Sequence, residues 1–152
     1  MAMQQASTRM SVVDIIKQDH EKTIEAISEL EKRVRGRPSS QNPVFPTMKK
    51  ELLGHMLAEE RLLYPLLDQE MMQQMQDARK EHNEVRMYLD KLSAGNMSED
   101  EWARDLQMMK QGIQHHIQTE ENRILPAAQR IVGDEKLRDL APQFKQTEQQ
   151  QM

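Results

Sequence analysis

The chain contains the pattern His-x3-Glu-Glu-x2-aliphatic-x-Pro twice, and this repeat restricts its fold more than any other feature. The first copy runs from His55 to Pro65 and the second from His116 to Pro126. A histidine and a glutamate four positions apart lie on one face of a helix, a single turn apart. Each copy can therefore offer one imidazole and one carboxylate to the same metal ion. The closing prolines predict a kink or an end of each helix just beyond that pair.

The similarity between the two copies extends upstream. His20 precedes the first copy and His82 precedes the second at nearly the same distance, and the apolar residues that follow these two histidines also match. Self-similarity over such a length indicates a duplicated helical hairpin. We expect each half of the chain to supply two histidines and one glutamate.

The composition favours helices. The 152 residues are enough for one domain with a substantial core. Helix-forming residues dominate, and aromatic residues make up only 3% of the chain. The 13 methionines suit the irregular gaps between packed helices.

Several kinds of protein are not expected. The net charge is −4 with both signs interspersed, so the sequence indicates no nucleic-acid-binding face. There is no cysteine, so any metal must be held by nitrogen and oxygen atoms. No apolar stretch resembles a signal segment or a membrane span, and we therefore expect a cytoplasmic protein without a membrane partner.

Apolar residues at helical spacing predict four helices. They cover about residues 11–34, 47–66, 73–92 and 98–127, with a turn around residues 68–72 before the third. Ser11 and Ser98 are expected N-caps, each with an acidic residue three positions later. Four amphipathic helices with mostly short connections predict an all-α fold, an up-down-up-down antiparallel four-helix bundle.

The expected domain organisation places this bundle at residues 11–133. Residues 1–10 are expected to be a flexible N-terminus, and residues 134–152 a short C-terminal extension. Within the extension we expect one short helix around Glu135–Leu140. The Gln-rich remainder is expected to be disordered.

Six polar residues fall where the helical period places the core. A single histidine there is usually a hydrogen-bonded core residue, and a glutamate can pair with a nearby arginine. Burying an unpaired carboxylate costs several kcal/mol or more, however, and a cation would neutralise both acids at once. We therefore predict that these six residues bind metal: His20, His55, Glu59, His82, His116 and Glu120.

The neighbouring polar residues leave alternatives open. Glu60 and Glu121 point about 100° away from the predicted ligand carboxylates, so they are expected to support the site or face water. Asp19 and Glu81 either accept hydrogen bonds from the ligand rings or face water. His115 and His116 are alternative candidates for the metal ligand in the second copy, and the internal repeat favours His116.

With its Glu-Glu-x2-aliphatic-x-Pro tails, the order His … His-x3-Glu … His … His-x3-Glu closely resembles the hemerythrin-like, or HHE cation-binding, domain family over about residues 10–132. The resemblance implies a four-helix bundle around two iron ions, a non-haem di-iron centre bridged by carboxylates and an oxo or hydroxo group. An open position there can meet dioxygen or nitric oxide. Carried over by motif, the ligands are His20, His55, Glu59, His82, His116 and Glu120.

The chain departs from the oxygen-carrying branch of that family, which has a His-x3-His pair on the third helix. Beside His82 the corresponding positions hold Ala78 and Arg86, and neither can replace an imidazole. Reversible oxygen carriage is therefore not expected. Relatives with four histidines and two glutamates are linked to sensing of oxygen, nitric oxide or peroxide, to oxidative or nitrosative stress, and to iron handling, which is the better match.

Three other functions stay open at this point. The same centre can belong to an enzyme that activates oxygen or dismutates peroxide. It can also belong to an interaction module whose surface changes when the metal changes state, with an unknown protein partner. A structural zinc bundle fits less well, because structural zinc sites rarely use six ligands rich in carboxylate.

Overall fold

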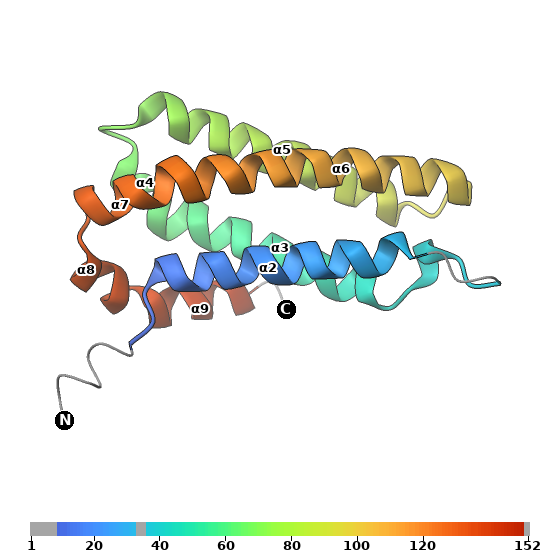
Figure 1. Cartoon of the computed structure of the whole chain (residues 1–152), viewed down its shortest axis with the longest axis horizontal. Coiled ribbons are helices and arrows are strands. Elements are labelled where there is room, and N and C mark those ends of the chain that lie inside the picture. The colour runs from blue at the N-terminus through green and yellow to red at the C-terminus, as the bar shows by residue number, and fades with distance from the viewer. Residues whose placement is uncertain (1–8, 33–35, 151–152) are drawn as a thin grey trace.

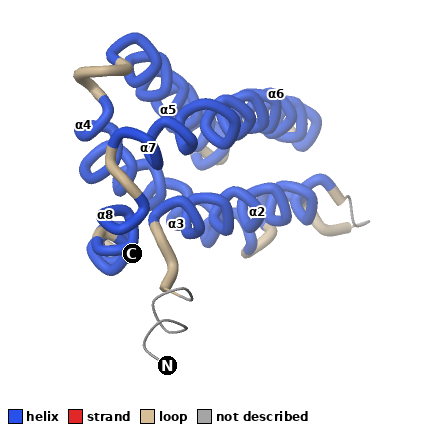
Figure 2. Tube along the Cα trace, turned by 60° about the vertical axis from the view of Figure 1, so that its left-hand side comes forward, coloured by secondary structure: helices blue, strands red, loops and turns tan. Residues whose placement is uncertain are grey.

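The computed structural model describes residues 9–32 and 36–150, and these are almost entirely helical (Figures 1 and 2). The long helices are α2 (Val12–Glu31), α3 (Val44–Ala58), α5 (Met72–Ser93) and α6 (Glu99–Thr119). Helix α2 packs against α3 and α6, and α5 packs against the same two helices. The described part of the chain holds no β-strand, which confirms the predicted all-α fold.

The helix starts follow local chemistry. Ser11 and Ser98 cap α2 and α6, and each forms a complete capping box with the acidic residue three positions later. Helix α3 begins at Val44, three residues before the predicted start, because the proline that follows in its first turn needs no hydrogen-bonding N–H there. Helix α2 ends at Glu31; Val34, near its predicted end, lies outside the described residues.

The first glutamate of each copy of the repeat begins a wide π-helical turn. The turn η2 (Glu59–Leu63) joins α3 to α4 (Tyr64–Leu67), and η3 (Glu120–Ile124) joins α6 to α7 (Leu125–Ile131). The N–H of Tyr64 donates to the carbonyl of Glu59, five residues back, and Leu125 donates in the same way to Glu120. A wider turn accommodates the next residue, proline, which lacks an N–H and would collide with the carbonyl four residues before it. The helices therefore continue through the repeat as π-turns rather than ending there.

Two apolar clusters fill the interior, one on each side of the repeat. The first cluster is built from both chain-terminal regions and the segments around the π-turns, and it includes Ile16, Leu67, Met75, Ala128 and Phe144. The second lies toward the other end of the long helices and includes Leu30, Met48, Leu89, Trp102 and Ile113. Helices α2 and α5 pass from the first cluster to the second around His20 and His82, and α3 and α6 lead from the second to the first where the turns at Glu59 and Glu120 begin. The polar residues thus form one layer between two dry cores.

The C-terminal extension is more ordered than predicted. The expected short helix is present as α8 (Asp134–Asp139), after a turn at Gly133, whose φ of 92° favours glycine. The expected disorder of the Gln-rich remainder is wrong for α9 (Ala141–Gln149), which packs along α3. Phe144 is fully buried in the first apolar cluster, and burial of this side chain holds a segment whose composition is otherwise polar.

The predicted domain boundary at residue 133 stays a prediction. Residues 1–8 of the expected flexible N-terminus lie outside the described residues. Across residues 9–32 and 36–150, every helix is too short or too polar to cross a lipid bilayer.

Candidate metal centre

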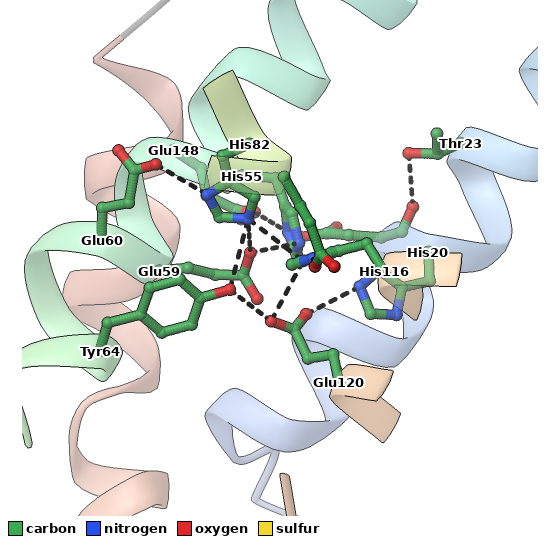
Figure 3. Close-up of polar contacts among 12 residues, drawn as sticks. His20, Thr23, His55, Glu59, Glu60, Tyr64, His82, His116, Glu120 and Glu148 are labelled. Atoms are coloured by element: carbon green, nitrogen blue, oxygen red, sulfur yellow. Dashed lines mark hydrogen bonds and ion pairs between the residues drawn. The ribbon is translucent and has the colours of Figure 1, made fainter. Parts of the chain in front are cut away.

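The six predicted ligands converge in the polar layer at the middle of the molecule (Figure 3). The four histidine residues keep 8% or less of their surface exposed, and both glutamates are fully buried. They come from α2, α3, η2, α5, α6 and η3, so the site exists only when all four long helices are packed. The residues are His20, His55, Glu59, His82, His116 and Glu120.

Each imidazole is held from outside by a carboxylate on a neighbouring helix. The Nδ1 atom of His20 lies 2.7 Å from a carboxylate oxygen of Glu121, and Nδ1 of His55 lies 2.9 Å from Asp19. A carboxylate can only accept, so each Nδ1 carries the proton and donates it. The remaining nitrogen, Nε2, then presents its lone pair to the centre in the neutral ring.

The second half of the repeat is built in the same way. Nδ1 of His82 lies 2.7 Å from Glu60, and Nδ1 of His116 lies 2.8 Å from Glu81. Arg86 stands at one of the positions where the oxygen-carrying branch would have an additional histidine. Its guanidinium donates hydrogen bonds to both oxygens of Glu60, at 3.0 and 2.8 Å. All four acidic neighbours therefore accept a hydrogen bond from a ligand ring instead of facing water. Each of the four is adjacent in sequence to a predicted ligand.

Glu59 lies between two of the rings without a hydrogen-bond donor. Its Oε1 atom is 3.2 Å from Nε2 of His55 and 3.1 Å from Nε2 of His82. These are short distances without hydrogen-bonding geometry, because both Glu59 oxygens and the His55 Nε2 atom are buried with no hydrogen-bond partner. Native proteins rarely leave such atoms unsatisfied, so this arrangement fits a positively charged group among them.

Glu120 closes the other side of the layer. Its Oε1 atom lies 3.0 Å from Nε2 of His20, and Oε2 lies 3.5 Å from Nε2 of His116. The hydroxyl of Tyr64 donates to Oε2 at 2.6 Å. The Nε2 atoms of His82 and His116 approach to 3.2 Å, a spacing that suits two lone pairs directed at one cation.

The electrostatics of the layer also favour positive charge beside the buried carboxylates. Burial by itself lowers the pKa of His55, but the charge of Glu59 and the hydrogen bonds that the ring donates to Asp19 and Glu148 outweigh burial and raise that pKa well above its usual value. Burial also lowers the pKa of His116, but the negative charge of Glu120 outweighs burial and raises that pKa to about 10. In the metal-free chain a proton is thus stabilised where the carboxylates face a ring nitrogen, and a metal ion would displace it.

Among the described residues, two overlapping groups of donor atoms in the polar layer could each hold a metal ion, and a third group, Asp19, His55 and Glu148, borders the layer. Within each group the ligand atoms lie within 4.8 Å of one another. The first group combines His20, His55, Glu59 and Glu120, and the second combines Glu59, His82 and His116. Imidazole nitrogens with carboxylate oxygens suit iron and similar divalent ions, and the unpartnered atoms of Glu59 lie where the two groups meet.

A small apolar cavity adjoins the four imidazoles. Its volume is about 20 Å³, which is room for one or two small atoms. Besides the rings of the four ligand histidines, its walls include Leu52, Met56, Val85 and Ile113. A small uncharged molecule would therefore meet the ring nitrogens from the side of the second apolar cluster.

The structure also decides between the two adjacent histidines. The His115 side chain is 70% exposed and its Nε2 lies 3.4 Å from the outer oxygen of Glu81, so it does not reach the layer. Two residues near the centre were not foreseen as site residues. Tyr64 breaks the repeat, since the second copy has Leu125 at that position, and Glu148 lies in the segment that was expected to be disordered. The repeat gave no signal for either one.

Comparison with known proteins supports the same interpretation. The family model described as the hemerythrin HHE cation binding domain matches residues 11–128 of the chain. No curated protein and no solved structure matches it. The matched segment contains all six predicted ligands and all four acidic ring acceptors.

Proposed function

The chain belongs to the hemerythrin HHE cation-binding family, and on that basis we propose that it holds two iron ions in the buried polar layer. His20 and His55 would bind one ion, and His82 and His116 the other. Glu59 would be shared, and Glu120 would complete the set. The observation that carries this proposal is the unsatisfied state of three buried atoms, Nε2 of His55 and both oxygens of Glu59.

We propose the up-down-up-down antiparallel topology for the four long helices. Its support is the order in which they cross the two apolar clusters. Helices α2 and α5 begin in the first cluster and end in the second, whereas α3 and α6, continued by η2 and η3, run the other way. This alternation places one imidazole of each helix at the same depth, as the shared layer requires.

The proposed role is binding or sensing of dioxygen, nitric oxide or peroxide, or iron handling, under oxidative or nitrosative stress in the cytoplasm. When bound, the iron pair supplies redox chemistry and an open position for a small ligand. The chain itself contributes the donor strength of four imidazoles, each strengthened by a carboxylate on Nδ1. The small apolar cavity beside the rings suits a diatomic molecule.

Metal content and absorption of the iron-loaded protein test this proposal. We expect about two irons per chain and near-ultraviolet charge-transfer absorption, and we expect both to be lost in Glu59→Leu. His115→Ala is the matched control, because this exposed ring does not reach the layer. Wild-type protein that retains no iron, with unchanged melting on iron addition, would refute the proposal.

A second candidate function, peroxide turnover, is favoured by Tyr64. Burial, and then the charge of Glu120, raise the pKa of this phenol well above its usual value, so it stays a neutral hydrogen-bond donor at the centre. Its hydroxyl lies 2.6 Å from Glu120 and 3.3 Å from Nε2 of His82. Turnover of hydrogen peroxide by the iron-loaded protein, reduced in Tyr64→Phe at equal iron content, would support an enzyme. Tight ligand binding without turnover would support a sensor.

A further inference from the structure

Helix α9 lies beyond the residues matched by the family and yet covers one wall of the polar layer. The match ends at residue 128, whereas α9 spans Ala141–Gln149 and packs along α3 (Figure 1). Its Phe144 is fully buried and meets the His55 ring edge-on, with ring centroids 6.3 Å apart and an interplanar angle of 73°. The wall beside His55 is thus made by the C-terminal extension of this chain.

The approach of α9 to α3 depends on the absence of a side chain at Gly54. A methyl group at that position would overlap the backbone carbonyl oxygen of Glu148 and lie 3.0 Å from its carbonyl carbon. Backbone atoms cannot rotate away as a flexible side chain can, so α9 would have to move. Gly112, in α6, offers the contrast, because a methyl group there would have no contact within 4 Å.

Glu148 brings a second carboxylate to His55. One of its oxygens lies 3.6 Å from Nδ1 of His55, the atom that donates to Asp19 at 2.9 Å. Within the part of the chain that the structure describes, the Nδ1 atom of each of the other three ligand histidines has one carboxylate nearby. The two halves of the duplicated site are therefore unequal.

A solvent cavity reaches His55 along this wall. It has a volume of about 180 Å³, and its lining includes Asp19, Lys22, Lys145 and Glu148 together with the His55 ring. The two carboxylates that face Nδ1 of His55 line this cavity. An ion that left the His20–His55 position through it would pass side chains of α9 together with those of α2 and α3.

We propose that α9 is a working part of the metal centre, in which Phe144 and Glu148 position the His55 ring and slow the exchange of the ion bound by His20 and His55. The proposal rests on the proposed binding of metal in the polar layer. Glu148 is a positioning residue here, since it acts through the His55 ring. The second ion position shares Glu59 with the first, but the carboxylates on Nδ1 of His82 and His116 come from η2 and α5 rather than from α9, so its ion should be less affected.

The test uses the full-length protein loaded with Co²⁺ and challenged with excess EDTA, with release followed by the visible absorption of bound Co²⁺. In Gly54→Ala we expect one of the two ions to leave about tenfold faster than in the wild type, the scale typical of disturbed ligand support. Gly112→Ala is the matched control, because it makes the same change in a long helix without a contact, and should release both ions at the wild-type rate.

A second pair of variants keeps the test decisive if Gly54→Ala does not fold. Glu148→Ala should also accelerate the release of one ion, and Glu148→Gln, which can still hydrogen-bond, should restore most of the wild-type rate. Wild-type release in Glu148→Ala, or equal acceleration of both ions, would overturn the proposal. Failure of the underlying metal site shows differently, because the wild-type protein would then bind no Co²⁺ at all, and both proposals would fall.

Discussion

Replacing Glu60 by glutamine tests whether the acidic ring acceptors stabilise the layer through their charge. Glu60 accepts from Nδ1 of His82 at 2.7 Å and from both terminal nitrogens of Arg86. Burial alone would raise its pKa, but these hydrogen bonds and charges outweigh it and lower the pKa from 4.5 to about 2. At 1.36 kcal/mol per pH unit the difference corresponds to about 3 kcal/mol, and we expect about 2–3 kcal/mol because the side chain is 22% exposed.

The sign of the pH dependence follows from the lowered pKa. The contribution of Glu60 is fully present above pH 4.5 and is lost as the pH falls toward 2, because the folded state then also binds the proton. In metal-free protein at pH 7, Glu60→Gln should therefore lower the free energy of unfolding by about 2–3 kcal/mol and the Tm by about 5–10 °C. The deficit should shrink below pH 4.5.

Urea unfolding of metal-free protein between pH 3 and pH 7 measures this difference. Glu84→Gln, at an exposed position of α5, is the matched control and should change stability little. A deficit that stays constant from pH 7 to pH 3 would refute the charge-based reasoning, since a purely steric effect of glutamine has no such dependence. Equal stability of variant and wild type at pH 7 would refute it as well.

Three further outcomes are expected. Because the pKa of His116 is raised to about 10, its contribution to the free energy of unfolding of the metal-free protein is fully present below about pH 6.5 and is lost as the pH rises through 10. Urea unfolding at pH 8 and pH 10.5 should show this loss. Calorimetry in two buffers should show proton release when Co²⁺ binds at pH 8. Tyr64→Phe should lower the free energy of unfolding in urea by about 1–3 kcal/mol, because it leaves the buried Glu120 oxygen without the hydroxyl that donates to it. Unchanged stability would mean that water or relaxation replaces the hydroxyl. His116→Ala should abolish tight Co²⁺ binding at one position by equilibrium dialysis, whereas His115→Ala should leave it within about twofold; the reverse order would exclude the register chosen here.

The candidate ligands could be predicted because their positions are set within single helices. A histidine and a glutamate four residues apart face the same way in any α-helix, and the repeat showed that the coincidence occurs twice. Burying six polar groups has few physical explanations other than a cation, so their apolar surroundings already indicated a metal. The capping boxes at Ser11 and Ser98 are equally local and were also predicted correctly.

The roles of the acidic neighbours could not be predicted from the sequence. Asp19, Glu60, Glu81 and Glu121 each hold a ring that belongs to a different helix from their own. Which helix lies beside which, and at what rotation, depends on side-chain packing across the bundle. The alternatives of supporting a ring or facing water therefore stayed open until the helices were placed.

The sequence by itself determined the helical class, the capped starts of α2 and α6 and the set of inward donors, because all three depend on periodicity and on contacts within about four residues. Tertiary structure alone decided that α9 closes the wall at His55, that Tyr64 caps Glu120 and that Glu59 lies unpartnered between two rings. These features join residues remote in sequence, and Phe144 shows the reason most clearly. Its burial against α3 releases enough apolar surface from water to order a Gln-rich helix that local composition would leave unfolded.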